Sequence, residues 1–263
     1  SRLKEFDIIH LHYPFFGGAE YVYLASLLRK QPYVLTYHMD VYGASFLKKQ
    51  IIRAYEPLLM RRIISRAALI AAVSKEHLGS SKVARFVDWD KVVEIPNGVD
   101  AEIFPPREKN PDLVAKHNLY GKTVVLFVGN LLPLKGVDLL IEAVSGVQDD
   151  RIVLVIVGGG YAETLYKQQV REKGLHDRII FAGPQSHTQY LPYYYNLCDF
   201  LVLPSTQSES FGLVVLEAMA SGKPAVISSL PGPSKLIENE RDGLIVAAGD
   251  VEDLRNKIEL LAA

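Results

Sequence analysis

Residues 200–228 read FLVLPSTQSESFGLVVLEAMASGKPAVIS, and this order of apolar and polar residues decides the fold. The apolar run 200–203 predicts a buried strand, and residues 213–220 predict a helix that ends near Gly222. A second apolar run follows and predicts another strand. A strand, a helix and a strand in this order form a parallel unit, in which ligands bind at the carboxyl ends of the strands. We therefore expect the loop 205–212 to lie at a binding edge.

Two carboxylates flank the start of this helix. Glu209 precedes the helix, and Glu217 lies about 6 Å inside it. The amides at a helix N-terminus carry a partial positive charge, which suits a phosphate group. A carboxylate beside a phosphate is favourable only where it accepts hydrogen bonds from neutral hydroxyls. The pattern therefore favours a ligand with polyol groups on both sides of its phosphates, as in a nucleotide sugar.

The same stretch resembles the Glu-x7-Glu motif of family-four retaining glycosyltransferases of the GT-B fold. Ser-Phe-Gly follows Glu209, and Ala-Met-Ala-Ser-Gly-Lys-Pro follows Glu217. The resemblance implies an α/β protein with two Rossmann-like domains that face a cleft, the first of them incomplete. It implies transfer of a hexosyl unit from a UDP- or GDP-sugar to a hydroxyl acceptor such as a glycan or lipid-linked sugar. It also implies a catalytic role for Glu209 and donor-binding roles for Phe211, Gly212, Leu213 and Glu217.

A second segment with donor-side residues begins at the end of the predicted strand 122–128. Relatives usually have Gly-Arg-Leu at the start of this loop and Lys-Gly at its end, where the Arg and Lys bind the diphosphate. Here Gly129 and Lys135 match, but Asn130 replaces the Arg and supplies no charge. We therefore expect donor binding to depend more on Lys135 and the helix amides. The resemblance also assigns Gly183 to a loop that contacts the nucleotide base.

The first half of the chain carries the residues expected on the acceptor side. His38 follows the second predicted strand, where the family places a His beside the transferring sugar. The resemblance thus implies a catalytic role for His38. Its position at the end of a strand, taken alone, fits a contact with a ligand and a structural role equally well. The resemblance also places on the acceptor side Tyr13, Gly17, Gly18 and Asp40.

The sequence predicts two domains joined by a short linker. We expect an acceptor-side domain over residues 1–106, a linker over 107–118 and a nucleotide-sugar-binding domain over 119–263. Prolines and charges without clear periodicity indicate the linker. The chain opens on a pattern typical of an interior strand. We therefore expect it to be truncated at the N-terminus. GT-B relatives usually continue into a further helix that this sequence does not show, so the resemblance leaves truncation at the C-terminus open.

Composition narrows the class of protein. The chain has 263 residues, of which 49% are hydrophobic and 22% charged, with a net charge of −1. This balance gives no reason to expect nucleic acid as a partner. The single Cys198 excludes a disulfide within the chain and fits a reducing compartment. No apolar run approaches the length of a membrane span, and we expect a cytoplasmic protein.

Residues 45–67 predict a long amphipathic helix with a basic face. Such a helix can lie on an anionic membrane, and many relatives act on lipid-linked acceptors. A core helix with a solvated charged face is the other interpretation, and it is the more common one.

We expect neither a metal nor a cofactor, because the nucleotide sugar is a substrate. Asp88 and Asp90 match the short Asp-x-Asp pattern that binds metals in GT-A transferases, but we interpret them as a loop or helix cap. Two alternatives stay open. One is a nucleotide-sugar epimerase of the same fold, and the other is a non-catalytic nucleotide-binding fragment.

Overall fold

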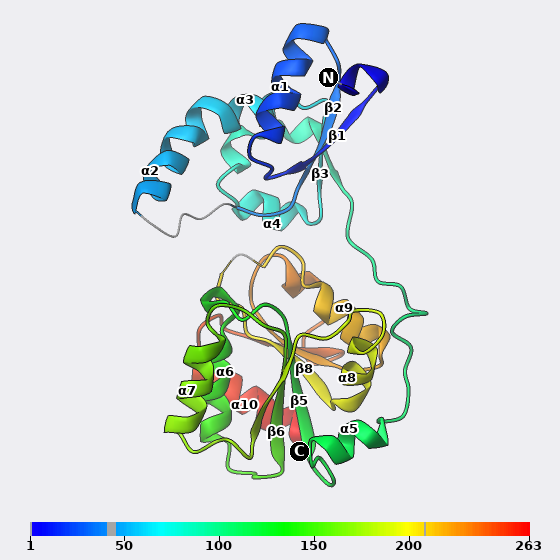
Figure 1. Cartoon of the computed structure of the whole chain (residues 1–263), viewed down its shortest axis with the longest axis vertical. Helices are drawn as coiled ribbons and strands as arrows, with labels where there is room; N and C mark the ends of the chain where they lie inside the picture. The colour runs from blue at the N-terminus through cyan, green and yellow to red at the C-terminus, as the bar shows by residue number, and fades with distance from the viewer. Residues whose placement is uncertain (1, 41–45, 208) are drawn as a thin grey trace. The chain divides into compact units, whose positions relative to one another are not determined.

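The computed structural model describes residues 2–40, 46–207 and 209–263, which form two compact units, Ser1–Asn97 and Gly98–Ala263. Each unit is built on a sheet of parallel strands, four in the first unit and six in the second (Figure 1). The expected α/β architecture is confirmed.

The first unit has the strand order β1-β2-β3-β4. Its strands are β1 (Ile9–Tyr13), β2 (Tyr33–Tyr37), β3 (Leu69–Ala72) and β4 (Val92–Glu94). Its helices are α1 (Gly18–Arg29), α2 (Phe46–Tyr55), α3 (Arg61–Arg66) and α4 (Lys75–Ser80), with shorter turns at Arg2–Glu5, Glu56–Met60, Ala84–Phe86 and Trp89–Lys91. Residues of β1 alternate between buried and exposed, so that Leu11 is buried while His10 and His12 are exposed. One side of this strand therefore packs into the core with α1 and α3, and its other side faces solvent.

The predicted helix 45–67 differs from the observed structure in two ways, and residue 45 lies outside the described residues. A π-turn (Glu56–Met60) separates α2 from α3, and Pro57 in this turn has no amide to complete the regular helical pattern. The apolar stripe also does not enter the core throughout. Ile51 and Leu58 are 59% and 57% exposed, whereas Ile63 is fully buried.

The second unit has the strand order β10-β9-β8-β5-β6-β7. Its strands are β5 (Thr123–Val128), β6 (Ile152–Val157), β7 (Ile179–Gly183), β8 (Phe200–Leu203), β9 (Ala225–Ser228) and β10 (Gly243–Val246). Its helices are α5 (Pro111–Lys116), α6 (Val137–Gly146), α7 (Glu163–Glu172), α8 (Leu191–Leu197), α9 (Leu213–Ala220) and α10 (Val251–Ala262), with short turns at Pro133–Lys135 and Pro233–Lys235. The chain first adds strands on one side of β5 and then, from β8 onward, on the other. This reversal creates a switch point between β5 and β8, where ligands bind in open parallel sheets.

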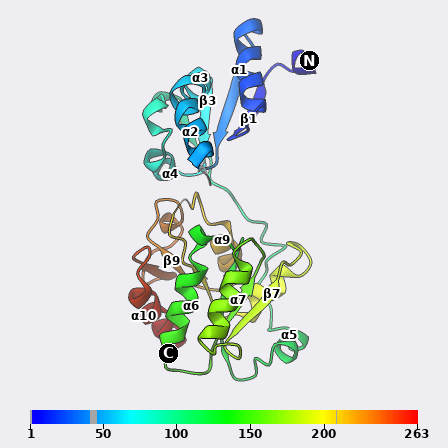
Figure 2. The same cartoon turned by 60° about the vertical axis from the view of Figure 1, so that its left-hand side comes forward.

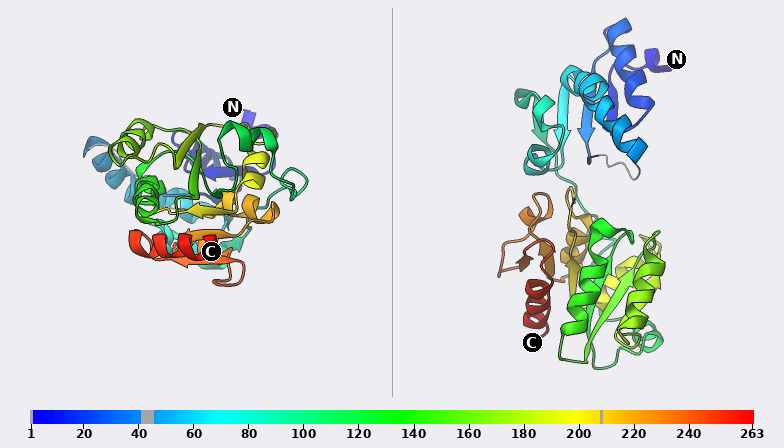
Figure 3. Two further views of the ribbon diagram at one scale, coloured as in Figure 1. Left: turned by 90° about the horizontal axis from the view of Figure 1, so that it is seen from below. Right: turned by 90° about the vertical axis from the view of Figure 1, so that its left-hand side faces the viewer.

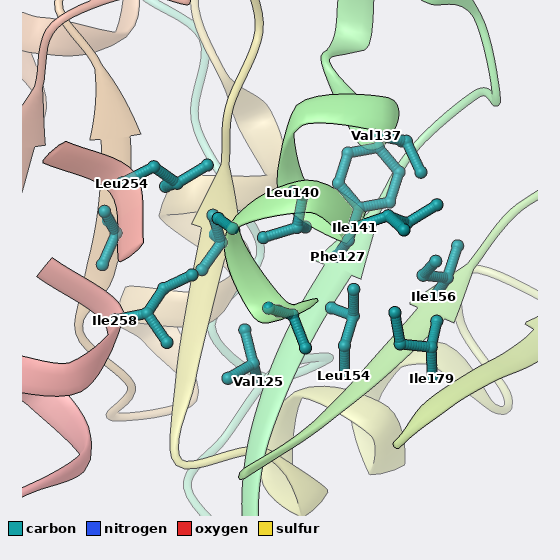
Figure 4. Packing of buried hydrophobic residues seen from close by; sticks show 14 of the residues in the cluster. Val125, Phe127, Val137, Leu140, Ile141, Leu154, Ile156, Ile179, Leu254 and Ile258 are labelled. Carbon is teal, nitrogen blue, oxygen red and sulfur yellow. The ribbon is translucent and has the colours of Figure 1, made fainter. Parts of the chain in front are cut away.

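Helices cover both faces of the six-stranded sheet. Helices α6, α7 and α10 contribute to the core on one face, and α8 and α9 contribute to the core on the other (Figure 2). Helix α10 packs beside α6 and the strands β9 and β10 (Figure 3). Figure 4 shows Phe127 and Ile156 of the strands beside Leu140 and Ile141 of α6, with Ile258 of α10 in the same cluster. All residues of β6 are buried, as expected for a strand covered on both sides.

The structure divides the chain earlier than the expected boundary at residue 106. Phe104 is 1% exposed and belongs to the core of the second unit. The segment expected as a linker contains α5, because Asn110 accepts hydrogen bonds from the amides of Asp112 and Leu113 and so begins a helix. The amide of Arg107 donates to the side chain of Asn196 on α8. Residues 98–118 thus form part of the second unit.

Candidate functional site

The loops after β5 and β8 meet at the switch point of the six-stranded sheet. The amide of Thr206 donates to the carbonyl of Leu134 over 2.9 Å, which joins the two loops directly. A Cβ atom on Gly136 would lie 2.1 Å from the carbonyl oxygen of Pro204. Gly136 also has a φ of +68°, which a residue with a side chain rarely adopts. Only glycine therefore allows this approach of the β5 loop to the β8 loop.

Lys135 and Glu209 form an ion pair across these two loops. The Nζ atom of Lys135 lies 2.6 Å from Oε2 of Glu209, and the side chains are only 21% and 12% exposed. The hydroxyl of Ser205 donates to the same carboxylate oxygen over 3.2 Å. Partial burial strengthens the attraction relative to a surface pair. The structure thus brings together Lys135 and Glu209, which the sequence assigns to the same site from different segments.

Helix α9 begins at Leu213, four residues after Glu209. Its N-cap residue Gly212 has a φ of +89°, and Phe211 before it is 6% exposed, so its ring anchors the loop in the protein. Leu213 is 42% exposed at the first turn. Amides of the first turn of an α-helix have no carbonyl partner one turn earlier, and they can bind an anion there. Ser208 of the loop lies outside the described residues.

Glu217 is held inside the second unit by two side chains that the sequence analysis did not assign to the site. It is 6% exposed, and the hydroxyl of Tyr195 on α8 donates to its Oε2 over 2.5 Å. The Nε2 atom of His187 lies 2.9 Å from its Oε1. Burial raises the pKa of Tyr195 well above its usual value, and the Glu217 carboxylate raises it further. Tyr195 therefore stays protonated and donates its hydrogen bond over a wide pH range.

The rings around Glu217 form one packed group. Phe104 meets His187 edge-on at 5.2 Å between ring centroids and Tyr195 edge-on at 5.6 Å. The sequence contains one signal for this arrangement, the three consecutive tyrosines 193–195. They predict a helix that packs its rings into the core, and Tyr194 and Tyr195 are buried as expected. The hydrogen bond to Glu217 could not be read from that pattern.

The other residues expected at the donor side lie on neighbouring strand ends. Gly129 and Asn130 follow β5 directly, and Asn130 is exposed. Gly183 ends β7, and its carbonyl accepts from the amide of Gly158 over 3.0 Å. A Cβ atom on Gly158 would lie 1.9 Å from the carbonyl oxygen of Gly129. The carboxyl ends of β5, β6 and β7 are therefore in direct backbone contact.

His38 lies in the first unit, beside two further histidines. Its backbone amide donates to the carbonyl of Tyr13 over 3.0 Å, which places the ends of β1 and β2 side by side. The Nε2 atom of His38 lies 2.8 Å from Nδ1 of His12. Burial lowers the pKa of His38, and the nearby His12 and His10 lower it further. The alternation of His10 and His12 on one strand was the signal for this group, and the sequence analysis did not use it.

The remaining residues expected on the acceptor side have mainly structural contacts in the first unit. The side chain of Tyr13 is 1% exposed. The carboxylate of Asp40 accepts from the hydroxyl of Tyr37 over 2.7 Å and from the amide of Lys82. Gly17 is the N-cap residue of α1, and Gly18 is its first residue. Their backbone shapes this loop, and a Cβ atom on Gly18 would lie 2.1 Å from the ring of Phe15.

The Asp-x-Asp pattern serves a structural role. The side chain of Asp88 accepts from the amide of Asp90 and caps the short turn Trp89–Lys91, which confirms the predicted cap. Among the described residues, no group of three or more His, Cys, Asp and Glu is arranged to hold a metal ion. Within the same residues, every helix is too short or too polar to span a membrane.

Comparison with known proteins identifies the family. The family model "Glycosyl transferases group 1" matches residues 109–263, and the model "Glycosyltransferase Family 4" matches residues 1–103. The chain is 28% identical to a D-inositol 3-phosphate glycosyltransferase of Stackebrandtia nassauensis, over 97% of this chain and 60% of the relative. It is 32% identical to a phosphatidyl-myo-inositol mannosyltransferase of Mycobacterium leprae, over 98% of this chain and 64% of the relative. The chain thus spans roughly three fifths of the length of these curated relatives.

Solved structures show the same fold. The structure of the Anabaena protein HepE in complex with UDP superposes with a TM-score of 0.82 at 24% identity, covering 97% of this chain and 69% of that one. Sucrose-phosphate synthase from Thermosynechococcus elongatus superposes with a TM-score of 0.77 at 28% identity, covering 98% of this chain and 64% of that one. The switch-point geometry, the matched family models and these superpositions agree, and the chain belongs to the group 1, family-four glycosyltransferases of the GT-B fold.

Proposed function

We propose that this protein is a retaining glycosyltransferase that transfers a hexosyl unit from a nucleotide diphosphate sugar to a hydroxyl acceptor. The observation that carries the proposal is the Lys135 and Glu209 ion pair in the loops that precede α9, with Glu217 buried in the second turn of this helix. A cation and helix amides suit a diphosphate, and carboxylates on either side suit the hydroxyls of a sugar and a ribose. The solved complex of HepE with UDP-glucose supports a donor of this chemical class.

The donor groups divide between the two ends of the nucleotide sugar. Lys135 and the first-turn amides of α9 neutralise the diphosphate, and Glu217 accepts from the ribose hydroxyls. Glu209 contacts the transferring sugar, while Gly129, Asn130 and Gly183 let the backbone approach the nucleotide. His38 acts on the transferring sugar from the first unit, and Tyr13, Gly17, Gly18 and Asp40 shape the acceptor side. No metal or cofactor takes part in this proposal.

The chemical step exchanges one bond at the anomeric carbon for another. The bond from this carbon to the diphosphate oxygen breaks, and a bond to the acceptor oxygen forms on the same face. The leaving diphosphate oxygen takes the proton of the acceptor hydroxyl. Lys135 and the α9 amides stabilise the negative charge that develops on the leaving group. The acceptor in this proposal is a glycan or a lipid-linked sugar.

Product analysis tests the proposal directly. The protein is incubated with UDP-glucose, UDP-galactose or GDP-mannose and neutral glycan acceptors, and the products are analysed by mass spectrometry and NMR. We expect a glycosylated acceptor with the donor's anomeric configuration. A free epimer of the donor sugar would instead support a nucleotide-sugar epimerase. Donor binding without either product would support a non-catalytic nucleotide-binding chain.

Binding of the diphosphate gives a second test, with a matched control pair. Lys135→Ala should weaken binding of a nucleoside diphosphate more than binding of the free nucleoside, and more at low salt. Lys173 forms a similar ion pair with Glu142 at 2.7 Å on another part of the unit. Lys173→Ala should change neither affinity. Equal losses for both ligands in Lys135→Ala would remove Lys135 from the phosphate site.

A membrane contact forms a separate part of the proposal, together with a cytoplasmic location. Phe46 is 78% exposed and Leu58 is 57% exposed, and the nearby Arg53 and Arg61 are also exposed. Exposed apolar and basic side chains together suit the surface of an anionic bilayer. The protein should sediment with phosphatidylserine vesicles but not with phosphatidylcholine vesicles, and Phe46→Ser should weaken this. Leu260→Ser, at a 60% exposed position of α10, serves as the control.

A further inference from the structure

A cavity of about 490 Å³ lies in the second unit, apart from the residues assigned above to the nucleotide sugar. It is lined by residues of α5, α8 and the segments before each of them. These are Asn110, Asp112, Leu113, Lys116, Gln185, Tyr190, Tyr193 and Tyr194. The volume falls within the range of small-molecule sites, about 300–1,000 Å³.

The lining combines aromatic rings with polar groups of both charges. Tyr190 is 57% exposed and offers a large ring surface at the cavity. The guanidinium carbon of Arg107 lies 5.5 Å from the ring centre of Tyr193, which supports this second ring from one side. Lys116 and Asp112 contribute one charge of each sign, so the cavity has no net charge from these side chains. An anion such as a phosphate would gain little here, because the acidic group offsets the basic one.

The lining is also held in place by the local structure. The side chain of Asn110 accepts from two amides at the start of α5 and so fixes the first turn of this helix. The side-chain amide of Gln185 donates to the carbonyl of Ala182 over 2.8 Å. The hydroxyl of Tyr194 lies 3.4 Å from Nε2 of His117, just after α5. The two walls of the cavity are therefore joined before any ligand arrives.

We propose that this cavity is a second binding site, and that its ligand is a neutral saccharide of one or two residues. Sugar rings present apolar C–H faces that pack on tyrosine rings, and their hydroxyls pair with amide, carboxylate and ammonium groups. This combination matches the lining better than a purely apolar or an anionic ligand. The inference does not depend on the proposed transfer reaction, because it concerns residues that take no part in that reaction.

Saturation-transfer NMR on the whole chain tests the site with maltose and methyl α-mannoside as probes. We expect the saturation-transfer signal of at least one sugar to persist when excess UDP is present, because the cavity shares no residue with those proposed to bind the nucleotide. Tyr190→Ala should weaken this binding by about tenfold through the loss of ring contact. Tyr120→Ala, at another tyrosine that is 68% exposed but does not line the cavity, should leave the binding unchanged.

Three results would overturn the proposal. They are no saturation of either sugar, loss of the signal on addition of UDP, and equal weakening by Tyr190→Ala and Tyr120→Ala. Gln185→Ala gives an independent check, because it removes a polar group of the lining without touching a tyrosine. It should also weaken sugar binding while the circular dichroism spectrum stays the same, and unchanged binding in this variant would likewise count against the site.

Discussion

The two sheets of this protein are built from the same kind of parallel strand but are covered differently. Every residue of β6 in the second unit is buried, whereas residues of β1 in the first unit alternate between buried and exposed. Hydrophobic clusters lie on both faces of the six-stranded sheet, while β1 turns His10 and His12 to solvent. The comparison shows that a continuous apolar run indicates a strand covered on both faces of its sheet. Alternation of apolar and polar residues indicates a strand covered on one face. It also predicts that the two sheets differ in their response to substitution.

The largest expected effect is the loss of a core side chain in the second unit. Phe127 on β5 is fully buried between the sheet and α6. Phe127→Ala should lower the free energy of unfolding by about 3–5 kcal/mol, because it leaves a cavity in a closely packed core. His12→Ala on the exposed side of β1 should change it by less than about 0.5 kcal/mol. Hydrogen exchange on peptides from each unit measures both effects, and similar losses would contradict the difference in coverage.

A smaller effect is expected at Glu217, the buried carboxylate that we propose as a ribose ligand. Glu217→Ala should weaken binding of a nucleoside diphosphate by about 1–3 kcal/mol, because it removes the charged hydrogen bonds to the ribose that we propose. Tyr195→Phe should cost less, since it keeps the carboxylate and removes one donor that orients it. Glu252→Ala on α10 is the control, because that side chain is 79% exposed. Calorimetry with folded variants measures these losses, and unchanged affinity in Glu217→Ala would refute its role.

Alkaline pH should affect both units in the same way. Burial raises the pKa of Tyr13 in the first unit and of Tyr166 in the second to about 12. Their contribution to stability is complete below the ordinary tyrosine pKa of about 10, and it is lost as the pH rises from there towards 12. Tyrosinate absorbance should therefore appear first for exposed tyrosines, with the buried ones following as the units open. Titration of all tyrosines near pH 10 in the folded protein would contradict the observed burial.

The smallest expected effect concerns the exposed side of β1. The pKa of His38 is lowered by burial and by its neighbours His12 and His10. The unfolded chain therefore binds a proton at this position more readily, and the first unit should lose stability as the pH falls through the ordinary histidine pKa of about 6.5. His12→Ala should raise the pKa of His38 towards its usual value. NMR titration of the ring protons checks this, and an unchanged His38 titration would show that His12 does not influence it.

Local sequence patterns predicted a strand and a helix of the second unit, but not the side-chain contacts between distant residues of this unit. The strand 200–203 and the helix 213–220 agree with β8 and α9, because each depends on a short run of residues. The ion pair of Lys135 with Glu209 joins residues far apart in the sequence, so only the fold reveals it. The hydrogen bond from Tyr195 to Glu217 is hidden for the same reason. The site residues were chosen by resemblance, and their roles stay predictions.

The domain boundary shows a different limit of sequence analysis. Prolines and charges after Phe104 are typical of a linker, but they do not reveal where a single aromatic side chain packs. Phe104 packs into the core of the second unit, and the residues next to it therefore belong to this unit as well. The side-chain cap of Asn110 then starts a helix within a segment of low periodicity. The packing of Phe104 depends on tertiary contacts that composition does not contain, whereas the Asn110 cap followed by Pro111 is a local helix-start signal that the sequence analysis did not use.

The backbone contacts of Gly136 and Gly158 have a consequence for how this protein can acquire new specificity. Carbonyl oxygens occupy the space where a side chain would begin at both positions, so neither loop can shift without its neighbour. Substitutions at these glycines would deform several strand ends at once. Exposed positions such as Asn130 in the β5 loop and Leu213 at the start of α9 carry no such constraint. Directed evolution of the proposed donor site should therefore accumulate side-chain changes at such positions and leave the two glycines untouched.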